Sequence, residues 1–240
     1  MTERLFYADP YDERCTATVT GITDQGGIML DRTVFYPTGG GQPGDCGTFT
    51  TAGGDTLLIA TTVTDRETGD IVHVPEGGLE LPSIGDSVAC AIDTKLRRAH
   101  MRCHTALHLL CSVIAFPVTG GQVSADKGRL DFDIPSAEAL DKDALAAELN
   151  ALVARDLPVM SETITDADLD ANPELVRTMS VQPPRGSGVI RMIRIGDVDY
   201  QPCGGTHVRA TGEIGQIALG KIEKKGAQNR RVRITITPPA

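Results

Sequence analysis

The chain has 240 residues, enough for one large domain or two small ones with a hydrophobic core. It is 40% hydrophobic and 23% charged, and no apolar run reaches the ~20 residues that a membrane helix needs. Because the charged N-terminal segment also lacks a secretory h-region, composition excludes a membrane span and predicts a soluble, cytoplasmic protein.

The net charge of −9 argues against a nucleic-acid partner, but the charge is unevenly distributed. Residues 1–93 carry 4 basic and 15 acidic side chains, whereas residues 94–240 carry 19 and 17. Residues 221–233 alone hold six positive charges and one negative charge. Such a strip can contact phosphates even on an acidic protein, although a solvated surface strand is the simpler interpretation.

The N-terminal part is expected to contain short strands rich in Val, Ile and Thr, separated by Gly, Asp and Pro turn signals. No helical period competes with them. We therefore predict a small β-barrel over residues 1–93. The expected strands are Cys15–Ile22, Ile28–Leu30, Thr33–Phe35, Thr56–Thr64, Ile71–Val74 and Ser87–Ile92.

The pattern changes to helical periodicity near Asp93. Apolar residues at spacings of three and four predict a helix over Thr94–Ala115, with Thr94 as its N-cap. The mixture of helices and strands that follows makes residues 94–240 an α+β domain, and the whole chain α+β. The later elements expected are a strand near Arg129–Ile134, a helix over Ser136–Arg155, a hairpin of Val189–Ile195 and Val198–Tyr200, and strands at Gln216–Lys221 and Val232–Thr237.

Three histidines on the first helix, His100, His104 and His108, suggest a metal site. At spacings of four they drift roughly 40° per step and share one face, where two imidazoles can reach one ion. Cys203 and His207 add a thiolate and an imidazole across a Gly-Gly turn. Imidazole and thiolate ligands together suit Zn²⁺, and a pair of packed core histidines is the alternative.

The six cysteines show no spacing of a disulfide framework, so we expect reduced thiols. Apart from Cys203, they are expected to behave as small buried hydrophobic residues. There is no H-E-x-x-H motif and no paired C-x-x-C, which argues against a zincin and against a zinc ribbon.

Several segments in the right order resemble one family. The segments RRAHMRCHTALHLL (Arg97–Leu110) and CGGTHV (Cys203–Val208) are similar to the editing domain of alanyl-tRNA synthetase and to its freestanding relatives, the alanyl-tRNA editing proteins (AlaX). DKGRLDFDI (Asp126–Ile134) and GEIG (Gly212–Gly215) are similar as well. FYPTGGGQPGDCG (Phe35–Gly47) resembles the glycine-rich segment of the longer AlaX subtype, in which an N-terminal β-domain precedes the editing domain.

The resemblance implies an editing domain of the threonyl/alanyl-tRNA synthetase type over residues 94–240, with Zn²⁺ bound by His104, His108, Cys203 and His207. It implies hydrolysis of mischarged tRNA(Ala), with Ser-tRNA(Ala) as the first expectation and Gly-tRNA(Ala) as the second, and no aminoacylation. The expected partner is the acceptor end of tRNA(Ala) carrying a wrong amino acid, without a membrane or an obligate protein partner. Two alternatives stay open: an editor of Ser-tRNA(Thr), and a zinc-stabilised RNA-binding module without catalysis.

The ester carbonyl of such a substrate must be attacked by water. A bound zinc ion can activate the water, polarise the carbonyl or hold the amino acid, and four protein ligands favour the last role. His100 is a candidate base or a partner of the ligands, with a packed histidine as the alternative. Gln42 and the preceding glycines Gly39, Gly40 and Gly41 are candidates for contacts with the ester or the RNA terminus, unless they form only a barrel turn.

Selection of serine would require a hydrogen bond to its hydroxyl group, because a site built for a hydroxyl rejects an analogue that lacks one. Thr105, Thr119 and Ser124 are the candidates, with Gln201 and Thr206 as weaker ones. Contacts with phosphates would position the RNA without selecting it. The candidate residues for them are Lys221, Lys224, Lys225, Arg230, Arg231 and Arg233.

Overall fold

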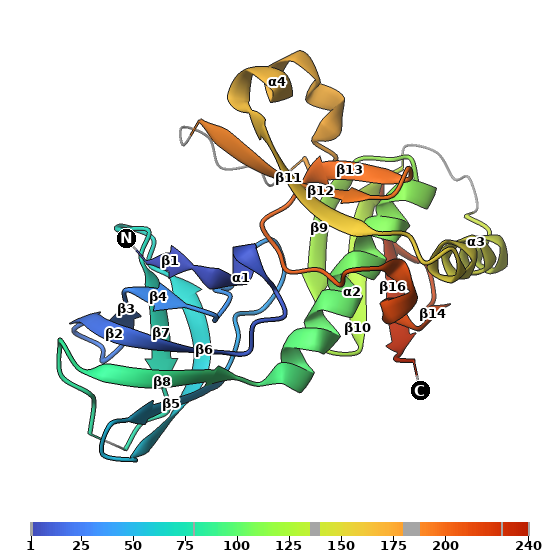
Figure 1. Ribbon diagram of the computed structural model, residues 1–240. Coiled ribbons are helices and arrows are strands. Elements are labelled where there is room, and N and C mark those ends of the chain that lie inside the picture. Colours follow the sequence, from blue (N-terminus) through green and yellow to red (C-terminus); the bar gives the residue numbers. More distant parts are fainter. Residues whose placement is uncertain (1, 79, 135–139, 180–187, 227, 240) are drawn as a thin grey trace. The chain divides into compact units, whose positions relative to one another are not determined.

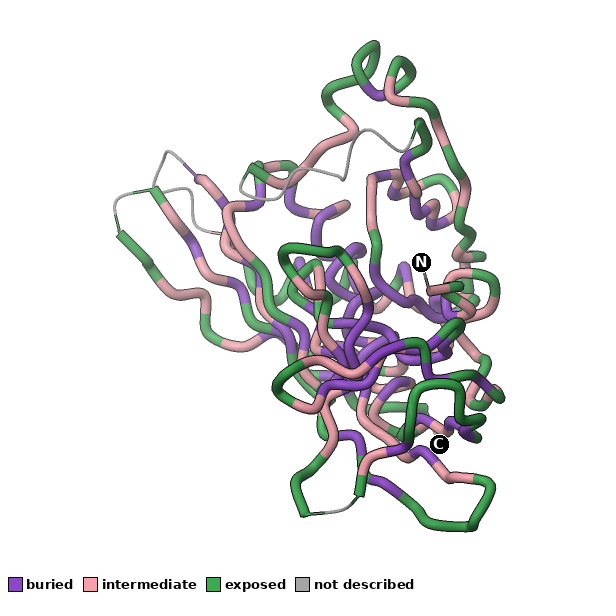
Figure 2. Tube along the Cα trace, turned by 90° about the vertical axis from the view of Figure 1, so that its left-hand side faces the viewer, coloured by how far each residue is buried: buried purple, intermediate pink, exposed green. Residues whose placement is uncertain are grey.

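The computed structural model describes residues 2–78, 80–134, 140–179, 188–226 and 228–239 (Figure 1). The chain divides into two compact units, Met1–Arg98 and Ala99–Ala240, and each is described by itself. Exposed residues gather at the turns, while buried residues occupy the interiors of strands and helices (Figure 2). Within the described ranges, no helix combines the length and the apolar composition that a membrane crossing requires.

The first unit is built around a closed barrel of six strands, so the predicted small β-barrel is confirmed. The expected strand Thr33–Phe35 was mostly wrong: the strand β4 covers Arg32–Thr33, and Val34 and Phe35 follow it as buried core residues outside any strand. The barrel order is β2 (Arg14–Ile22), β3 (Ile28–Leu30), β7 (Ile71–Pro75), β6 (Thr56–Thr64), β5 (Gly47–Thr51) and β8 (Ser87–Ile92). Outside it lie β1 (Glu3–Arg4), which pairs with β4 (Arg32–Thr33), and the short helix α1 (Leu5–Ala8).

Strand alternation fills the barrel with apolar side chains. Val88, Cys90 and Ile92 of β8 all point inward, because successive residues of a strand face opposite sides. Phe35 and Phe49 pack edge to face with ring centroids 5.5 Å apart. The strand β5 was not predicted, since Phe49 is the single large apolar residue in its Thr-rich sequence.

His73 is a fully buried polar residue in this apolar core. Its Nδ1 lies 2.9 Å from the carbonyl oxygen of Ile28, and its Nε2 lies 2.8 Å from the hydroxyl of Thr33. The Ile28 carbonyl oxygen can only accept, so Nδ1 carries the ring proton and the unprotonated Nε2 accepts from the Thr33 hydroxyl, whose oxygen accepts from the Phe35 N–H. The contacts therefore specify one neutral tautomer, and burial lowers the pKa of His73 to about 4.

We expect the barrel to lose stability as the pH falls from about 6.5 toward 4, because the unfolded His73 takes up a proton there and the folded one does not. The full contribution of about 3 kcal/mol is present above pH 6.5. Hydrogen exchange of the β6 and β7 amides across this range measures it, with His73→Gln as the control. An equally steep pH dependence in the variant would contradict the assignment.

The second unit contains two antiparallel sheets. The larger, five-stranded sheet has the order β14 (Gln216–Leu219), β16 (Asn229–Thr237), β10 (Lys127–Asp133), β9 (Val118–Val123), with β15 (Glu223–Lys225) also paired to β16. The smaller sheet has the order β11 (Val159–Thr165), β12 (Val189–Ile195), β13 (Asp199–Pro202). The predicted hairpin and late strands are confirmed, whereas β9 and β11 were not predicted.

The helix α2 (Thr94–Val113) carries the three clustered histidines. Its predicted N-cap was wrong: the carboxylate of Asp93 accepts from the Leu96 N–H at 2.9 Å, and Thr94 is already helical. Further along, α2 packs closely on β10, since a Cβ at Gly128 would lie 2.7 Å from the Cys103 sulfur. The glycine thus sets how near the helix approaches the sheet.

The helix α3 (Lys142–Ala154) begins at Asp141, whose side chain accepts from two backbone N–H groups. Residues 136–139 of the predicted helix lie outside the described residues. Asn150 joins α3 to the edge strand β14 by accepting from the Ile217 N–H and donating to the Ile217 carbonyl. The short helices α4 (Asp166–Ala171), η1 (Pro173–Leu175) and η2 (Thr211–Ile214) complete the unit.

Candidate metal centre

Four side chains that were singled out in the sequence come together in the second unit. His104, His108, Cys203 and His207 place one ligand atom each within 4.8 Å of one another. The Cys203 Sγ lies 3.6 Å from the His104 Nε2 and 3.4 Å from the His207 Nε2. The three imidazoles are buried, and their ring centroids are 4.6 to 5.4 Å apart.

These distances fit a tetrahedral metal ion. With Zn–S bonds of about 2.3 Å and Zn–N bonds of about 2.0 Å, a tetrahedral site separates sulfur from nitrogen by about 3.5 Å. The two sulfur–nitrogen separations in the cluster, 3.4 and 3.6 Å, match that value. A set of three imidazoles and one thiolate is also a chemically suitable one for Zn²⁺. The cluster can therefore bind a metal ion.

Neighbouring groups orient two of the imidazoles. His108 presents its Nδ1 to Asp199 Oδ2 at 2.8 Å, so its Nε2 is the atom left for a metal ion. Gln201 completes this contact, donating from its side-chain amide to both carboxylate oxygens of Asp199. On the other side, the His207 Nδ1 lies 3.1 Å from the hydroxyl of Thr105. Each of these imidazoles is thereby held with Nε2 toward the centre.

The Cys203 turn is fixed by Arg191, whose guanidinium donates to the carbonyl oxygens of Cys203 and Gly205 at 2.7 and 3.0 Å. The Gly205 N–H donates to the Cys203 sulfur at 3.3 Å. Neither Arg191 nor Asp199 was predicted as part of the site. A signal for Asp199 was available, since Asp199, Gln201 and Cys203 are spaced by two and strand residues so spaced share a face.

Electrostatics favour a thiolate at this centre. Burial by itself would raise the pKa of Cys203, but the electrostatic influence of the His104, His207 and His108 imidazoles outweighs burial and holds that pKa well below its usual range. Burial lowers the pKa of His207 to about 3. For His108, burial opposes the charged form, yet the Cys203 thiolate and Asp199 raise its pKa to about 10. The low pKa favours the thiolate form of Cys203, which is the form that binds metal ions.

The other predicted residues of the second unit lie in different surroundings. His100 is buried on α2, one turn before His104. Thr105 is fully buried, and its hydroxyl donates to the Met101 carbonyl oxygen at 2.9 Å while it contacts His207. Thr119 on β9 donates to Asn229 at 2.8 Å. Ser124 is half-buried in the turn between β9 and β10.

The glycine-rich segment of the first unit forms a tight turn. Gly39 and Gln42 exchange backbone hydrogen bonds of 2.9 and 3.1 Å, and Gly40 and Gly41 have φ angles of +57° and +80°. Two consecutive positive φ angles favour glycine at both positions. The Gln42 side chain is fully buried.

The basic strip spans β15, β16 and the residues before them, and acidic partners occupy much of it. Arg231 makes two hydrogen bonds to Asp131, at 2.7 and 2.8 Å. Glu223 lies 2.9 Å from Arg233 and 3.1 Å from Lys225. Arg230 is buried, whereas Lys221 and Lys224 are exposed. Fewer charges are therefore available to phosphates than the sequence count suggested.

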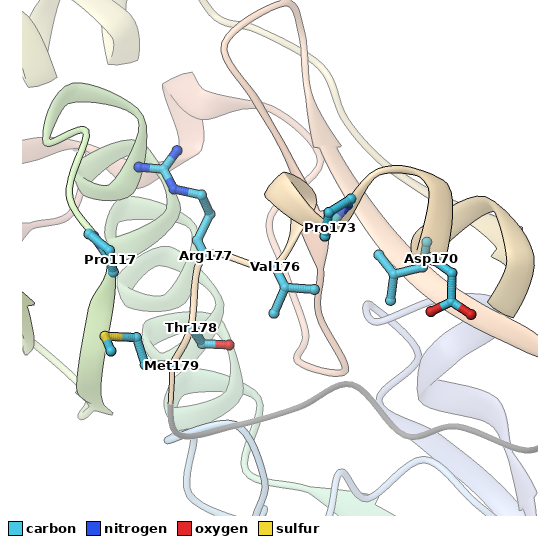
Figure 3. Close-up of a pocket in the computed structure, with 8 residues that line it drawn as sticks. Pro117, Asp170, Pro173, Val176, Arg177, Thr178 and Met179 are labelled. Atoms are coloured by element: carbon cyan, nitrogen blue, oxygen red, sulfur yellow. The ribbon is translucent and has the colours of Figure 1, made fainter.

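A separate cavity of about 390 Å³ lies in the second unit beside α4 and η1 (Figure 3). Most of its lining is apolar, and none of the predicted site residues contributes to it. Among the described residues that line it, none is a histidine, a cysteine or a serine. The lining residues are Pro117, Leu169, Asp170, Pro173, Val176, Arg177, Thr178 and Met179.

Both units are similar to parts of known proteins. The family model described as the threonyl and alanyl tRNA synthetase second additional domain matches residues 190–233, and that described as tRNA synthetases class II (A) matches residues 6–96. The alanyl-tRNA editing protein AlaX-M of Methanosarcina barkeri is 34% identical over 98% of this chain and 99% of its own length. AlaX-L of Pyrococcus horikoshii is 32% identical over 98% of this chain and 58% of its own. The alanine–tRNA ligase of Korarchaeum cryptofilum is 37% identical over 93% of this chain and 25% of its own.

The barrel followed by an α+β domain of the second-additional-domain type defines the class: an editing module of the kind related to alanyl- and threonyl-tRNA synthetases. Since relatives above 30% identity match from end to end, the chain belongs to the AlaX family of alanyl-tRNA editing proteins. The resemblance predicted from the histidine, cysteine and glycine segments is thereby confirmed.

Proposed function

We propose that the protein is a trans-editing hydrolase that deacylates mischarged tRNA(Ala), with Ser-tRNA(Ala) as the main substrate and Gly-tRNA(Ala) as a second one. The observation that carries the proposal is the cluster of His104, His108, Cys203 and His207 in a chain that matches AlaX-M over its whole length. The residues fit Zn²⁺, which when bound would supply a Lewis acid beside the ester or its amino acid. The second unit would then be the editing domain.

The surrounding residues support defined roles. Asp199 and Thr105 hold the imidazoles of His108 and His207 in a fixed tautomer and orientation. Because Thr105 already donates to Met101, we assign it to this positioning role ahead of contact with the serine hydroxyl. His100 remains the candidate proton acceptor on the same helix, and Thr119, Ser124, the glycine turn and Gln42 remain candidates for substrate contacts.

For the tRNA, Lys221 and Lys224 are the strongest candidates for phosphate contacts, since both are exposed and the ion pairs described for this strip involve their neighbours. Lys225 and Arg233 share Glu223, and Arg231 is engaged by Asp131. Arg230 is the weakest candidate because it is buried. The arginines of this strip are thus assigned mainly to contacts within the sheet, and the two exposed lysines to contacts with the RNA.

The proposal predicts rapid, metal-dependent loss of serine from Ser-tRNA(Ala), with Ala-tRNA(Ala) and Ser-tRNA(Thr) left intact. The measurement is deacylation by zinc-loaded and chelator-stripped protein, side by side. Cys203→Ala should abolish both zinc binding and turnover, whereas Cys46→Ala, which changes a cysteine outside the cluster, should retain both. Hydrolysis of Ser-tRNA(Thr) alone would favour the threonyl alternative. Stoichiometric zinc without any hydrolysis would favour an RNA-binding module.

A further inference from the structure

Two cysteines of the barrel face each other across a strand pair. Cys15 of β2 and Cys90 of β8 are partners in the antiparallel register. The Ile92 N–H donates to the Glu13 carbonyl oxygen, and the Val19 N–H donates to the Asp86 carbonyl oxygen. Hydrogen-bonded pairs recur at every second position, so Cys15 and Cys90 also form a hydrogen-bonded pair.

That register places the two cysteines at a Cα separation that a disulfide can span. The Cα atoms of such a pair are about 5.5 Å apart, and disulfides span Cα separations of about 4.4 to 6.8 Å. Both side chains point into the barrel, where the Cys90 thiol lies 3.9 Å from the Val88 carbonyl oxygen and interacts with the Cys15 sulfur, so that the pKa of Cys15 is lowered and that of Cys90 is raised. Both cysteines are free. The Cβ atoms of cross-strand partners lie about 4.5 to 5.5 Å apart, against about 3.5 to 4.5 Å in a disulfide, so joining the two sulfurs requires a local approach of about 1 Å and no change of strand register.

The two thiols differ in reactivity. Cys15 is half-buried, and the hydrogen bond from Cys90 lowers its pKa, with further help from a backbone hydrogen bond from Val34 and the charge of Arg32. Cys90 is 2% exposed, and its pKa is raised by the hydrogen bond to Cys15 and by burial. The pair therefore combines a partly buried thiol of lowered pKa with a buried neighbouring thiol, the arrangement of a peroxide-reactive cysteine and its resolving partner.

We propose that Cys15 and Cys90 form a redox-active dithiol that hydrogen peroxide converts into an intramolecular disulfide. The Cys15 thiolate attacks one peroxide oxygen, the O–O bond breaks, and Cys15 becomes a sulfenic acid while hydroxide leaves and is protonated to water. The Cys90 sulfur then attacks the Cys15 sulfur, the S–O bond breaks, and the thiol proton leaves with the oxygen as a second water. Two thiols are oxidised by two electrons, and one peroxide is reduced.

The remaining barrel and helix cysteines do not share these features. Burial raises the pKa of Cys46. Burial also raises the pKa of Cys103 to about 11 and that of Cys111 to about 12. All three are therefore poor candidates for the first attack on peroxide at neutral pH, the step that Cys15 performs. Cys203 lies in the histidine cluster, where a bound zinc ion would hold its sulfur.

Peptide mapping of the zinc-loaded full-length protein tests the inference. The folded protein is treated with hydrogen peroxide, remaining thiols are blocked with N-ethylmaleimide, and the digest is analysed by mass spectrometry without reductant. We expect a Cys15–Cys90 cross-linked peptide that dithiothreitol removes. Cys46→Ser should leave the cross-link unchanged. In Cys90→Ser, dimedone should instead trap a sulfenic acid at Cys15.

The mapping of the wild-type protein decides the question even where a variant folds poorly. The proposal is overturned if the cross-link forms only after unfolding in urea. It is also overturned if peroxide modifies Cys46 as fast as Cys15, because the thiols would then not differ in the way the structure requires.

Discussion

Replacing Arg97 with Met is expected to lower the free energy of unfolding of the barrel unit by about 3 to 5 kcal/mol, the usual effect of leaving one partner of a buried ion pair alone. Arg97 is 1% exposed, and its Nε lies 3.0 Å from both oxygens of Asp45. The same guanidinium donates to the carbonyl oxygens of Pro10 and Val34 at 2.8 and 2.5 Å. The substitution therefore leaves the Asp45 carboxylate and the two carbonyl oxygens without the hydrogen bonds that Arg97 donates.

Urea unfolding of the full-length variant, read by hydrogen exchange of the barrel strands, measures this loss. Arg32→Met is the matched control in the same unit, because the Arg32–Glu3 pair is about half exposed and should contribute at most ~1 kcal/mol. The double variant Arg97→Met with Asp45→Asn should recover part of the loss, since it removes the unpaired charge. Equal effects of the Arg97 and Arg32 substitutions would show that the buried pair is not a major stabilising contact.

Local sequence signals predicted the barrel and the metal cluster. Hydrophobic alternation and turn residues are properties of short segments, and a His-x-x-x-His spacing places two imidazoles on one helical face wherever the helix lies. The strand β5 was not predicted because its Thr-rich segment carries little hydrophobic signal. Its position in the barrel depends on pairing with β6 and β8. The Asp93 cap differs from the prediction by one residue, which is the ordinary uncertainty of helix ends.

The contacts that depend on strand register could not be predicted. The basic strip was counted as six charges, but the pairing of β10 with β16 sets Asp131 directly opposite Arg231. The pairing of β15 with β16 likewise brings Glu223 beside Arg233. Asp199 and Thr105 meet the ligand histidines across 91 and 102 residues of sequence. Such partners are products of tertiary packing, so residue type alone does not reveal them.

Replacing Asp199 with Asn is expected to weaken zinc binding by about 10- to 100-fold, which is the usual effect of losing a carboxylate behind a ligand histidine. Asp199 is 7% exposed and accepts from the His108 Nδ1 at 2.8 Å. The amide of Asn can still accept this hydrogen bond but carries no charge. The His108 ring would then keep its orientation and become a less basic ligand.

Competition titration with a chelator measures the affinity, and Asp197→Asn is the matched control because Asp197 sits in the same hairpin, pairs with exposed Arg155 and is itself exposed. Deacylation should fall at limiting zinc and recover when zinc is in excess, since the substitution acts on ion retention and leaves Cys203 and the other ligands in place. A variant that binds zinc as tightly as the parent would show that Asp199 does not support metal binding. A variant that binds zinc normally but stays inactive would instead place Asp199 in the hydrolysis step.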